Sequence, residues 1–115
     1  MVEIIASGHV CLDLIPGMDS VPLDRMASPG KLFEIGALEM STGGSVSNTG
    51  LALHRLGVDV GLMGSVGDDM IGRIIIALFK DTDPKLAEYI HQREGEASSY
   101  SVIMSPQNSD RIIFH

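Results

Sequence analysis

The sequence predicts an α/β fold with a largely parallel sheet flanked by helices, and three observations predict it. Short apolar segments typical of strands alternate along the chain with amphipathic segments typical of helices. The segment Val58–Gly67 is apolar on both of its faces, which is typical of a central strand in a sheet covered by helices. Ile71, Ile74, Ile75 and Leu78 repeat with the period of a helix.

Composition narrows the class of protein. The 115 residues suit one domain or part of one, 44% of them are hydrophobic, and the formal net charge is −7. So few cations argue against a nucleic-acid partner. The longest apolar run, Ile74–Phe79, is too short to cross a bilayer, so we expect no membrane partner and a cytoplasmic protein. Cys11 is the only cysteine and the four histidines are widely spaced, so we expect no metal site.

The first residues predict two extended segments. Glu3–Ser7 has the composition of a buried strand, and a break follows at Gly8 and His9. A second extended run covers Val10–Ile15 and is expected to end at the Pro16–Gly17 pair.

Asp13 lies within the second run, between two leucines. A carboxylate among apolar neighbours is costly to desolvate unless a hydrogen-bonding group or a polar ligand meets it. The alternative is an ordinary solvated carboxylate on an edge strand. The residues alone leave both interpretations open.

The middle of the chain predicts a loop, an exposed strand and a helix. Met18–Lys31 is rich in turn-forming residues, and the rough alternation of Leu32–Met40 is typical of an exposed strand or flap. An apolar stripe predicts a helix over Ser45–Leu56, which ends at Gly57.

Further along, Asp68 or Asp69 is expected to cap the helix that carries the isoleucine stripe. A third short helix is predicted from Asp83 to about Arg93, because a proline follows Asp83 and a glycine follows Arg93 closely.

Two strands, Ser98–Ser105 and Asp110–His115, are predicted at the end of the chain, joined around Pro106, Gln107 and Asn108. The second is strand-like to its last residue, so we expect the chain to be an N-terminal fragment of a longer fold.

The stretch TGGSVSN, residues 42–48, places two glycines before the first predicted helix. Glycines allow a ligand to approach the backbone closely, and a helix start offers unpaired N–H groups. The amide of Asn48 can both donate and accept, which suits the hydroxyl groups of a polyol. The alternative is a glycine-rich turn with Asn48 as a local cap. No P-loop and no G-x-G-x-x-G motif is present.

Several spaced motifs resemble one family. GGSVSNTGLALHRLG followed by VGLMGSVGDDMIG is similar to the N-terminal signature of the ribokinase-like (PfkB) carbohydrate kinases, and SGHVCLDLIP and SPGKL extend the likeness. The resemblance implies that residues 1–115 are the N-terminal portion of a ribokinase-like kinase domain. It also implies a small β lid, with lid segments near residues 10–41 and 98–115.

The resemblance implies a substrate site made of Asp13, Gly43, Gly44 and Asn48, in which the aspartate and asparagine bind sugar hydroxyls. Many members carry asparagine where this chain has Cys11, a departure that puts ribose specificity in doubt.

Further positions follow from the same resemblance. Gly67, Asp68 and Gly72 match the G-D-D-x-x-G element, interpreted as structural, with Asp69 as a helix cap. Ser99 and Tyr100 are weaker candidates for substrate contact, since alternate faces of a strand explain them equally well.

The function that the resemblance implies is transfer of the ATP γ-phosphoryl group to a sugar hydroxymethyl group, with ATP and Mg²⁺ as cofactors. No residue of this chain is identified for either cofactor, and the catalytic aspartate is expected beyond His115. These residues would therefore hold sugar without catalysis. The alternatives are a non-catalytic sugar- or nucleoside-binding module and a structural fragment.

The substrate and the oligomeric state stay open. The substrate is a small-molecule sugar or nucleoside: a ketohexose, a phosphorylated hexose, a deoxygluconate-type acid, ribose or a nucleoside all suit the family. A homodimer through the lid strands is among the oligomeric states that the resemblance allows.

Overall fold

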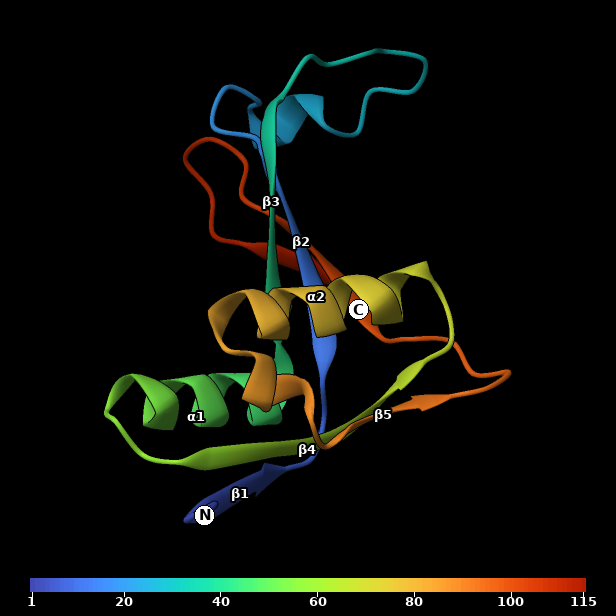
Figure 1. Cartoon of the computed structure of the whole chain (residues 1–115). Coiled ribbons are helices and arrows are strands. Elements are labelled where there is room, and N and C mark those ends of the chain that lie inside the picture. Colours follow the sequence, from blue (N-terminus) through green and yellow to red (C-terminus); the bar gives the residue numbers. More distant parts are fainter. The chain divides into compact units, whose positions relative to one another are not determined.

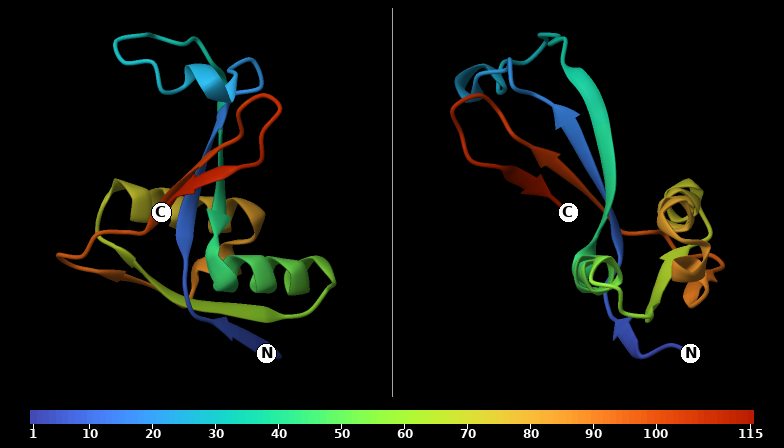
Figure 2. Two further views of the ribbon diagram at one scale, coloured as in Figure 1. Left: turned by 180° about the vertical axis from the view of Figure 1, so that it is seen from behind. Right: turned by 60° about the vertical axis from the view of Figure 1, so that its left-hand side comes forward.

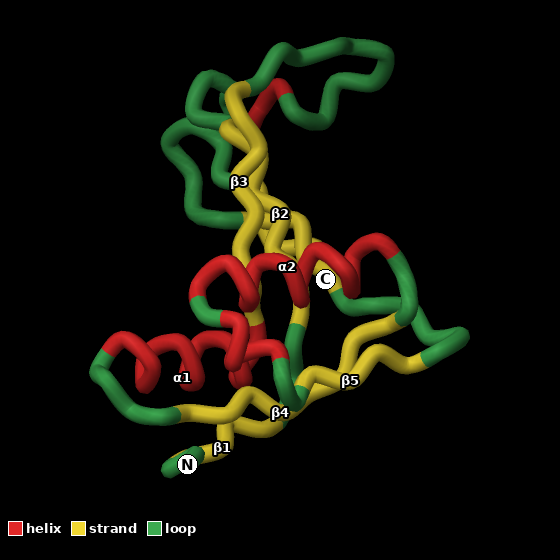
Figure 3. Tube along the Cα trace, in the orientation of Figure 1, coloured by secondary structure: helices red, strands yellow, loops and turns green.

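The computed structural model describes all residues, 1–115, as two compact units. Unit 1 consists of Met1–Leu12 and Ser41–Tyr100, and unit 2 consists of Asp13–Met40 and Ser101–His115. Helices α1 and α2 belong to unit 1, whereas the helical content of unit 2 is the single turn η1 (Figure 3).

The elements follow one another as shown in Figure 1. In chain order they are β1 Ile4–Ser7, β2 Cys11–Gly17, η1 Leu23–Arg25, β3 Gly36–Gly43, α1 Gly44–Arg55, β4 Val60–Gly67, α2 Met70–Thr82, η2 Pro84–Ala87, β5 Ile90–Arg93, β6 Tyr100–Met104 and β7 Ile112–Phe114. None of the helices is long and apolar enough to span a membrane.

Unit 1 contains a parallel sheet with the strand order β1-β4-β5. Ile4 pairs with Val60 at the start of the β1–β4 ladder, and Gly67 pairs with Arg93 at the end of the β4–β5 ladder. The chain begins beside β1, at the edge of this sheet (Figure 2). The predicted α/β class with parallel pairing is therefore confirmed, and β4 is its central strand.

Both long helices lie on the same side of this sheet (Figure 1). Under α1, Leu62 is fully buried, and a methyl group added at Gly50 would collide with its side chain. On the opposite side of β4, Met63 and Ser65 are exposed. The predicted parallel sheet flanked by helices is thus present, and in this chain the helices cover one of its faces.

Strand β1 was predicted to be buried, and this is wrong. The side chains of Ile4 and Ile5 are 43% and 51% exposed, and Ala6 is the only buried residue of the strand. The physical reason is position, because β1 is an edge strand that pairs with β4 alone in the three-stranded sheet. An apolar composition does not distinguish an edge strand from a central one.

Helices α1 and α2 confirm the sequence predictions to within two residues. Helix α1 is followed by Gly57, whose φ of 86° is in the left-handed region and whose N–H donates to the carbonyl of His54. Helix α2 buries Ile75 and Phe79 and has Asp69 as its N-cap. The apolar stripes fixed these helices because each faces the sheet.

The third predicted helix, Asp83–Arg93, is wrong. Asp83 does cap a helical turn, and Pro84 does occupy its first position, but η2 ends at Ala87. The chain then extends as β5, whose residues pair with the end of β4. Pairing with a strand that is distant in sequence outweighs the weak local preference for helix.

Unit 2 holds the long loop and the final hairpin. A four-stranded sheet has the order β3-β2-β6-β7, and β6 pairs with β7 in antiparallel fashion. Strand β2 ends at Gly17, within the Pro16–Gly17 pair where an end was expected. Strand β3 is largely exposed, as predicted, but begins at Gly36 and runs to Gly43. The expected turn is present at Asn108, with a φ of 56°.

The loop of unit 2 is tied to the turn between the last strands. The N–H of Gln107 donates to the carbonyl of Val21 at 2.9 Å. Val21 and Met18 are only 2% and 5% exposed, so the segment predicted as a surface loop contributes two side chains to the core. Its amino-acid composition indicated a loop correctly but did not reveal these anchors.

Candidate functional site

The candidate site begins with the turn that leads from β3 into α1. Gly43 is the N-cap of α1 with an extended backbone, and Gly44 is the first helical residue, with a φ of 88°. The hydroxyls of Thr42 and Ser47 are hydrogen-bonded to each other across the two glycines. Ser47 is fully buried, so this bond fixes the turn from inside.

Gly44 packs directly against the backbone of His9. A methyl group added at Gly44 would lie 2.9 Å from the carbonyl carbon of His9 and still closer to its oxygen. The same carbonyl accepts a hydrogen bond of 3.2 Å from the N–H of Val46. The lack of a side chain at position 44 is therefore required by contacts within unit 1.

The turn between β1 and β2 approaches the same helix start through Gly8. This glycine has a φ of 146°, and a methyl group there would lie 2.9 Å from the hydroxyl oxygen of Ser45. Gly44 and Ser45 are the first two residues of α1, and N–H groups at a helix start have no partner within the helix. Two backbone donors thus remain for a ligand or for water at the positive end of the α1 dipole.

Asn48 is exposed and is the fifth residue of α1. It lies in the second turn of the helix, because α1 begins at Gly44.

Asp13 is half-buried and is the third residue of β2. It belongs to unit 2, whereas Gly43, Gly44 and Asn48 belong to unit 1. The structure brings the three residues of unit 1 together at one helix start. Their grouping with Asp13 stays a prediction.

A second turn, between β4 and α2, is tied to the chain before β6 by Asp69. Its carboxylate accepts hydrogen bonds of 2.8 Å from the N–H of Gly72 and of 2.8 Å from the N–H of Ser98. It also accepts from the hydroxyl of Ser98 at 2.6 Å, and that hydroxyl oxygen accepts from the N–H of Gly67 at 2.8 Å. These bonds agree with the interpretation of the G-D-D-x-x-G element, residues 67–72, as structural.

These bonds lower the pKa of Asp69 below its ordinary value. The hydroxyl of Ser98 contributes most, followed by the N–H groups of Ser98 and Gly72, because each stabilises the charged carboxylate. Partial burial opposes the shift, and Arg73 adds a smaller lowering. Asp68, by contrast, is exposed and pairs only loosely with Arg73, at 3.9 Å.

The two glycines of this motif are also required by packing. A methyl group at Gly72 would collide with the carbonyl oxygen of Gly67, and one at Gly67 would collide with that of Glu96. Ser99, which follows the anchored Ser98, accepts a hydrogen bond from the N–H of Leu12 through its carbonyl.

Sequence reasoning missed His9 and Ser98. His9 supports the diglycine through its backbone, and a backbone contact leaves no signal in the residue type. Ser98 is 29 residues from Asp69, and no local pattern links residues so far apart.

No three His, Cys, Asp or Glu side chains gather where they could hold a metal ion, and the chain lacks the glycine-rich phosphate motifs. We therefore assign neither Mg²⁺ nor ATP to any residue described above.

Comparison with curated proteins finds relatives among the 5-dehydro-2-deoxygluconokinases. The 5-dehydro-2-deoxygluconokinase of Clostridium perfringens (strain 13 / Type A) is 28% identical over 114 residues, covering 97% of this chain and 31% of that protein. The protein of the same name from Shouchella clausii (strain KSM-K16) is 25% identical over 114 residues, covering 97% of this chain and 32% of that protein. The chain thus spans about a third of the length of these relatives.

Solved structures with the same fold include sugar and nucleoside kinases. The Arabidopsis thaliana ribokinase complexed with ribose and ATP has a TM-score of 0.72 and 18% identity, over 99% of this chain and 36% of that one. The Methanocaldococcus jannaschii nucleoside kinase has a TM-score of 0.69 and 24% identity, over 99% of this chain and 36% of that one. Residues 1–114 match the family described as pfkB family carbohydrate kinase. The chain therefore belongs to the pfkB carbohydrate kinase family.

Proposed function

We propose that the full-length protein is a kinase that transfers the γ-phosphoryl group of ATP to a hydroxymethyl group of a sugar. The 115 residues described here supply the sugar-binding half. The observation that carries the proposal is the start of α1, where the N–H groups of Gly44 and Ser45 follow Gly43 and the exposed side chain of Asn48 comes one helical turn later. Membership of the family over residues 1–114 supports the same function.

The chemistry of this helix start suits a polyol. The N–H groups of Gly44 and Ser45 donate only, whereas the amide of Asn48 donates and accepts. A sugar hydroxyl also does both, so each hydroxyl that meets Asn48 can be paired in either direction. We assign to Asp13 the role of accepting hydrogen bonds from two sugar hydroxyls, which would hold the acceptor hydroxymethyl group in place.

Phosphoryl transfer requires mainly that the acceptor hydroxyl be held in line with the phosphate and that developing charge be stabilised. The residues of this chain serve the first requirement. ATP with Mg²⁺ would supply the phosphoryl group, and we place its binding residues and the general base outside these 115 residues.

Among the sugars that the family accepts, we propose a deoxygluconate-type acid as the first substrate to test. The curated relatives at 25–28% identity are named 5-dehydro-2-deoxygluconokinase. The cysteine at position 11, where many relatives of ribokinase type carry asparagine, argues in the same direction, because a thiol is a poor partner for a ribose hydroxyl.

Hydrogen exchange of the 115-residue chain tests the site directly. The chain is tested with 5-dehydro-2-deoxygluconate and with the other candidate substrates named above. We expect at least one of them to slow exchange at the N–H groups of Gly44 and Ser45. An Asn48→Ala variant should bind the same sugar at least about tenfold more weakly, the cost of removing a hydrogen-bonding partner. If no sugar protects these amides at millimolar concentration, the sugar site is rejected.

Kinetics of the full-length enzyme test Asp13. An Asp13→Ala variant should have a higher KM for the sugar and a lower kcat, because the acceptor hydroxyl is no longer positioned. Asp24→Ala is the control, since Asp24 is an exposed aspartate of the same unit, in η1. Equal kinetics of the two variants would remove Asp13 from the site.

The proposal also predicts that the 115-residue chain alone is inactive. Purified chain should release no ADP from ATP in a sugar-dependent manner. Turnover above that of a mock preparation would show that the chain holds its own nucleotide site. It would contradict the proposal that the nucleotide site lies outside these 115 residues.

A further inference from the structure

The sheet of unit 2 carries a row of three polar side chains, two of which the proposed sugar site does not include. Strand β6 lies between β2 and β7 in the strand order β3-β2-β6-β7. The hydroxyl of Ser101 on β6 and Nδ1 of His115, directly after β7, are hydrogen-bonded at 2.8 Å. Val102 pairs with Phe114, so Ser101 and His115 are the next opposed positions of this antiparallel pair.

Asp13 is the third member of the row. Strands β2 and β6 run in the same direction (Figure 2), and the N–H of Leu12 donates to the carbonyl of Ser99 at 3.1 Å. In a parallel ladder an N–H meets the carbonyl of the residue before its partner, so Leu12 is level with Tyr100. One residue further, Asp13 is level with Ser101 and lies on the same face of the sheet.

All three residues belong to unit 2. Neighbouring strands are about 4.8 Å apart, so Asp13 and His115 stand at the two ends of a row roughly 10 Å long. Ser101, in the middle, is only 6% exposed, and its hydroxyl holds the imidazole of His115 from the inside. When this hydroxyl donates to Nδ1, the ring proton is on Nε2, which is then a donor. Both end residues already interact within the chain, so a ligand exchanges partners with them.

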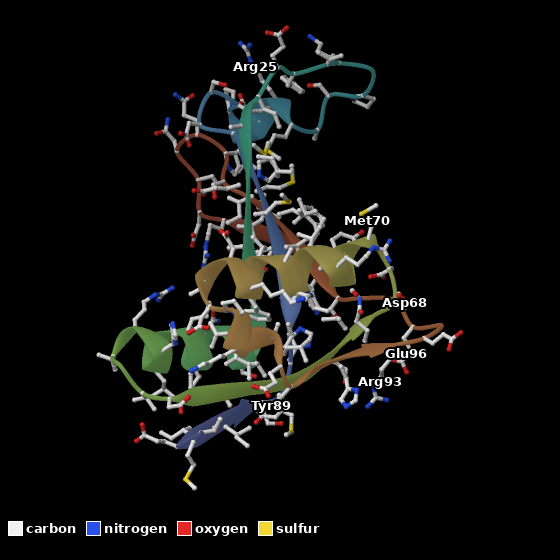
Figure 4. All side chains as sticks on the ribbon, viewed as in Figure 1. Arg25, Asp68, Met70, Tyr89, Arg93 and Glu96 are labelled. Carbon is white, nitrogen blue, oxygen red and sulfur yellow. The ribbon has the colours of Figure 1, made fainter.

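The cationic side chains of unit 2 lie elsewhere. Figure 4 shows Arg25 in the loop that follows β2, whereas Asp13 is the third of the seven residues of that strand. Lys31 belongs to the same loop, and Arg111 precedes β7, at the end of the strand away from His115. His115 is therefore the side chain of the row that can meet an anion with a positive charge.

From this row, and resting on the kinase function proposed above, we propose that His115 binds the carboxylate of a sugar acid and makes the enzyme specific for it. Asp13 holds the end of the substrate that bears the acceptor hydroxymethyl group. A second carboxylate beside Asp13 would be repelled, so the carboxylate of the acid belongs at the other end of the row. There Nε2 of His115 donates to it. Ser101 is a positioning residue, because it orients the imidazole.

The length of the row favours an open-chain substrate. 5-Dehydro-2-deoxygluconate has no hydroxyl at C2, the group that would close a five-membered ring on the carbonyl carbon C5. It therefore stays an open chain, with the hydroxymethyl group and the carboxylate at opposite ends. Ile113 lies two positions before His115 on the same face, so an apolar side chain is available for the methylene group next to the carboxylate.

The test compares 5-dehydro-2-deoxygluconate with its methyl ester as substrates of the full-length enzyme. The ester keeps the carbon chain and the acceptor hydroxymethyl group but carries no charge. We expect kcat/KM of the wild type to be at least about tenfold higher for the acid, the usual effect of a charge-assisted hydrogen bond. Equal values for the two substrates would overturn the proposal.

His115→Leu should remove this preference. Its kcat/KM for the acid should fall at least about tenfold and that for the ester should stay within about twofold, because only the acid loses a charged partner. His54→Leu, in α1 of unit 1, is the control and should keep the preference. Misfolding lowers both activities alike, so the ratio of the two reports recognition. An equal loss for acid and ester in His115→Leu would show a structural role and overturn the proposal.

Ser101→Ala tests the positioning role. The ratio of acid to ester activity should fall several-fold, less than in His115→Leu, because the ring is present but no longer held. Ser109→Ala is the control, since its hydroxyl lies in the turn between β6 and β7 and donates to the carbonyl of Asp110. An unchanged ratio in Ser101→Ala would contradict the orientation of His115 by Ser101.

The same assays separate this inference from the kinase function on which it rests. If the full-length enzyme phosphorylates a neutral sugar but not the acid, the specificity given to His115 is rejected and the kinase function stands. If it phosphorylates none of the candidate substrates, both are rejected.

Discussion

Asp69 accepts two hydrogen bonds from Ser98, one from its backbone N–H at 2.8 Å and one from its hydroxyl at 2.6 Å. This pair joins the start of α2 to the segment that leads into β6. One carboxylate thus caps a helix and holds a distant part of the chain, so its removal should affect both.

Asp69→Asn should lower the stability of the chain measurably. The amide keeps the size of the side chain but loses the negative charge, and one of its ends donates where only donors are present. Thermal unfolding followed by circular dichroism provides the measurement. Asp68→Asn is the matched control, because Asp68 is exposed and pairs with Arg73 only at 3.9 Å. Equal melting temperatures of the two variants would contradict the anchoring role.

Acid should remove the same contribution. Because the pKa of Asp69 is lower in the folded chain than the ordinary 3.8, its charged form adds stability above that pH, and the contribution is lost as acid protonates the carboxylate. The difference in unfolding free energy between the wild type and Asp69→Asn should therefore be constant near neutral pH and shrink below about pH 4. Urea unfolding at a series of pH values checks this. If the difference in unfolding free energy grows in acid instead, the pKa of Asp69 is not lowered by folding.

Gly44→Ala should destabilise the chain more than Gly57→Ala. Both glycines have a φ near 87°, at 88° and 86°, so alanine at either position bears a backbone cost of about 1–2 kcal/mol. A methyl group at position 57 meets no atom within 4 Å, whereas one at position 44 meets the carbonyl of His9. The excess cost of Gly44→Ala in urea unfolding measures this contact. Equal losses of stability in Gly44→Ala and Gly57→Ala would show that the backbone at His9 can move aside at little cost.

Gly50 and Leu62 should show strong coupling. Gly50→Ala should cost about 1–3 kcal/mol because its methyl group collides with the side chain of Leu62. Leu62→Ala alone should cost about 2–5 kcal/mol, since Leu62 is fully buried. In the double variant the new methyl group enters the space left by the leucine, so the two costs should add to less than their sum. If the stability loss of the double variant equals the sum of the two single losses, residues 50 and 62 are not in contact.

The sequence was sufficient to predict an element where residues close together in the chain form an apolar stripe that packs against the sheet. The stripe that includes Ile75 placed α2, and the Asp69 cap was among the two aspartates considered. The motif also singled out Gly44, although for contact with a ligand and not for the contact with the backbone of His9 that the structure shows. These features depend on residues a few positions apart, which is the range over which helical periodicity and capping operate.

Sequence reasoning failed where pairing between distant segments decides the structure. The helix expected up to Arg93 is replaced by β5, because Ile90 and its neighbours complete a ladder with β4. The burial of β1 was overestimated because amino-acid composition does not reveal whether a strand lies at the edge or in the centre of a sheet. For the site, the sequence identified Gly44 but not His9, the residue against which it packs.

The contact between Gly44 and His9 has a consequence for genetics. A selection that scores loss of the proposed kinase activity would recover substitutions at position 44 readily, and such alleles would be attributed to the proposed sugar site. Most of the defect would instead be a shortage of folded protein, visible as low abundance in cells and relieved at reduced growth temperature. Alleles at Asn48, whose side chain is exposed, would show the reverse: normal abundance with lost binding.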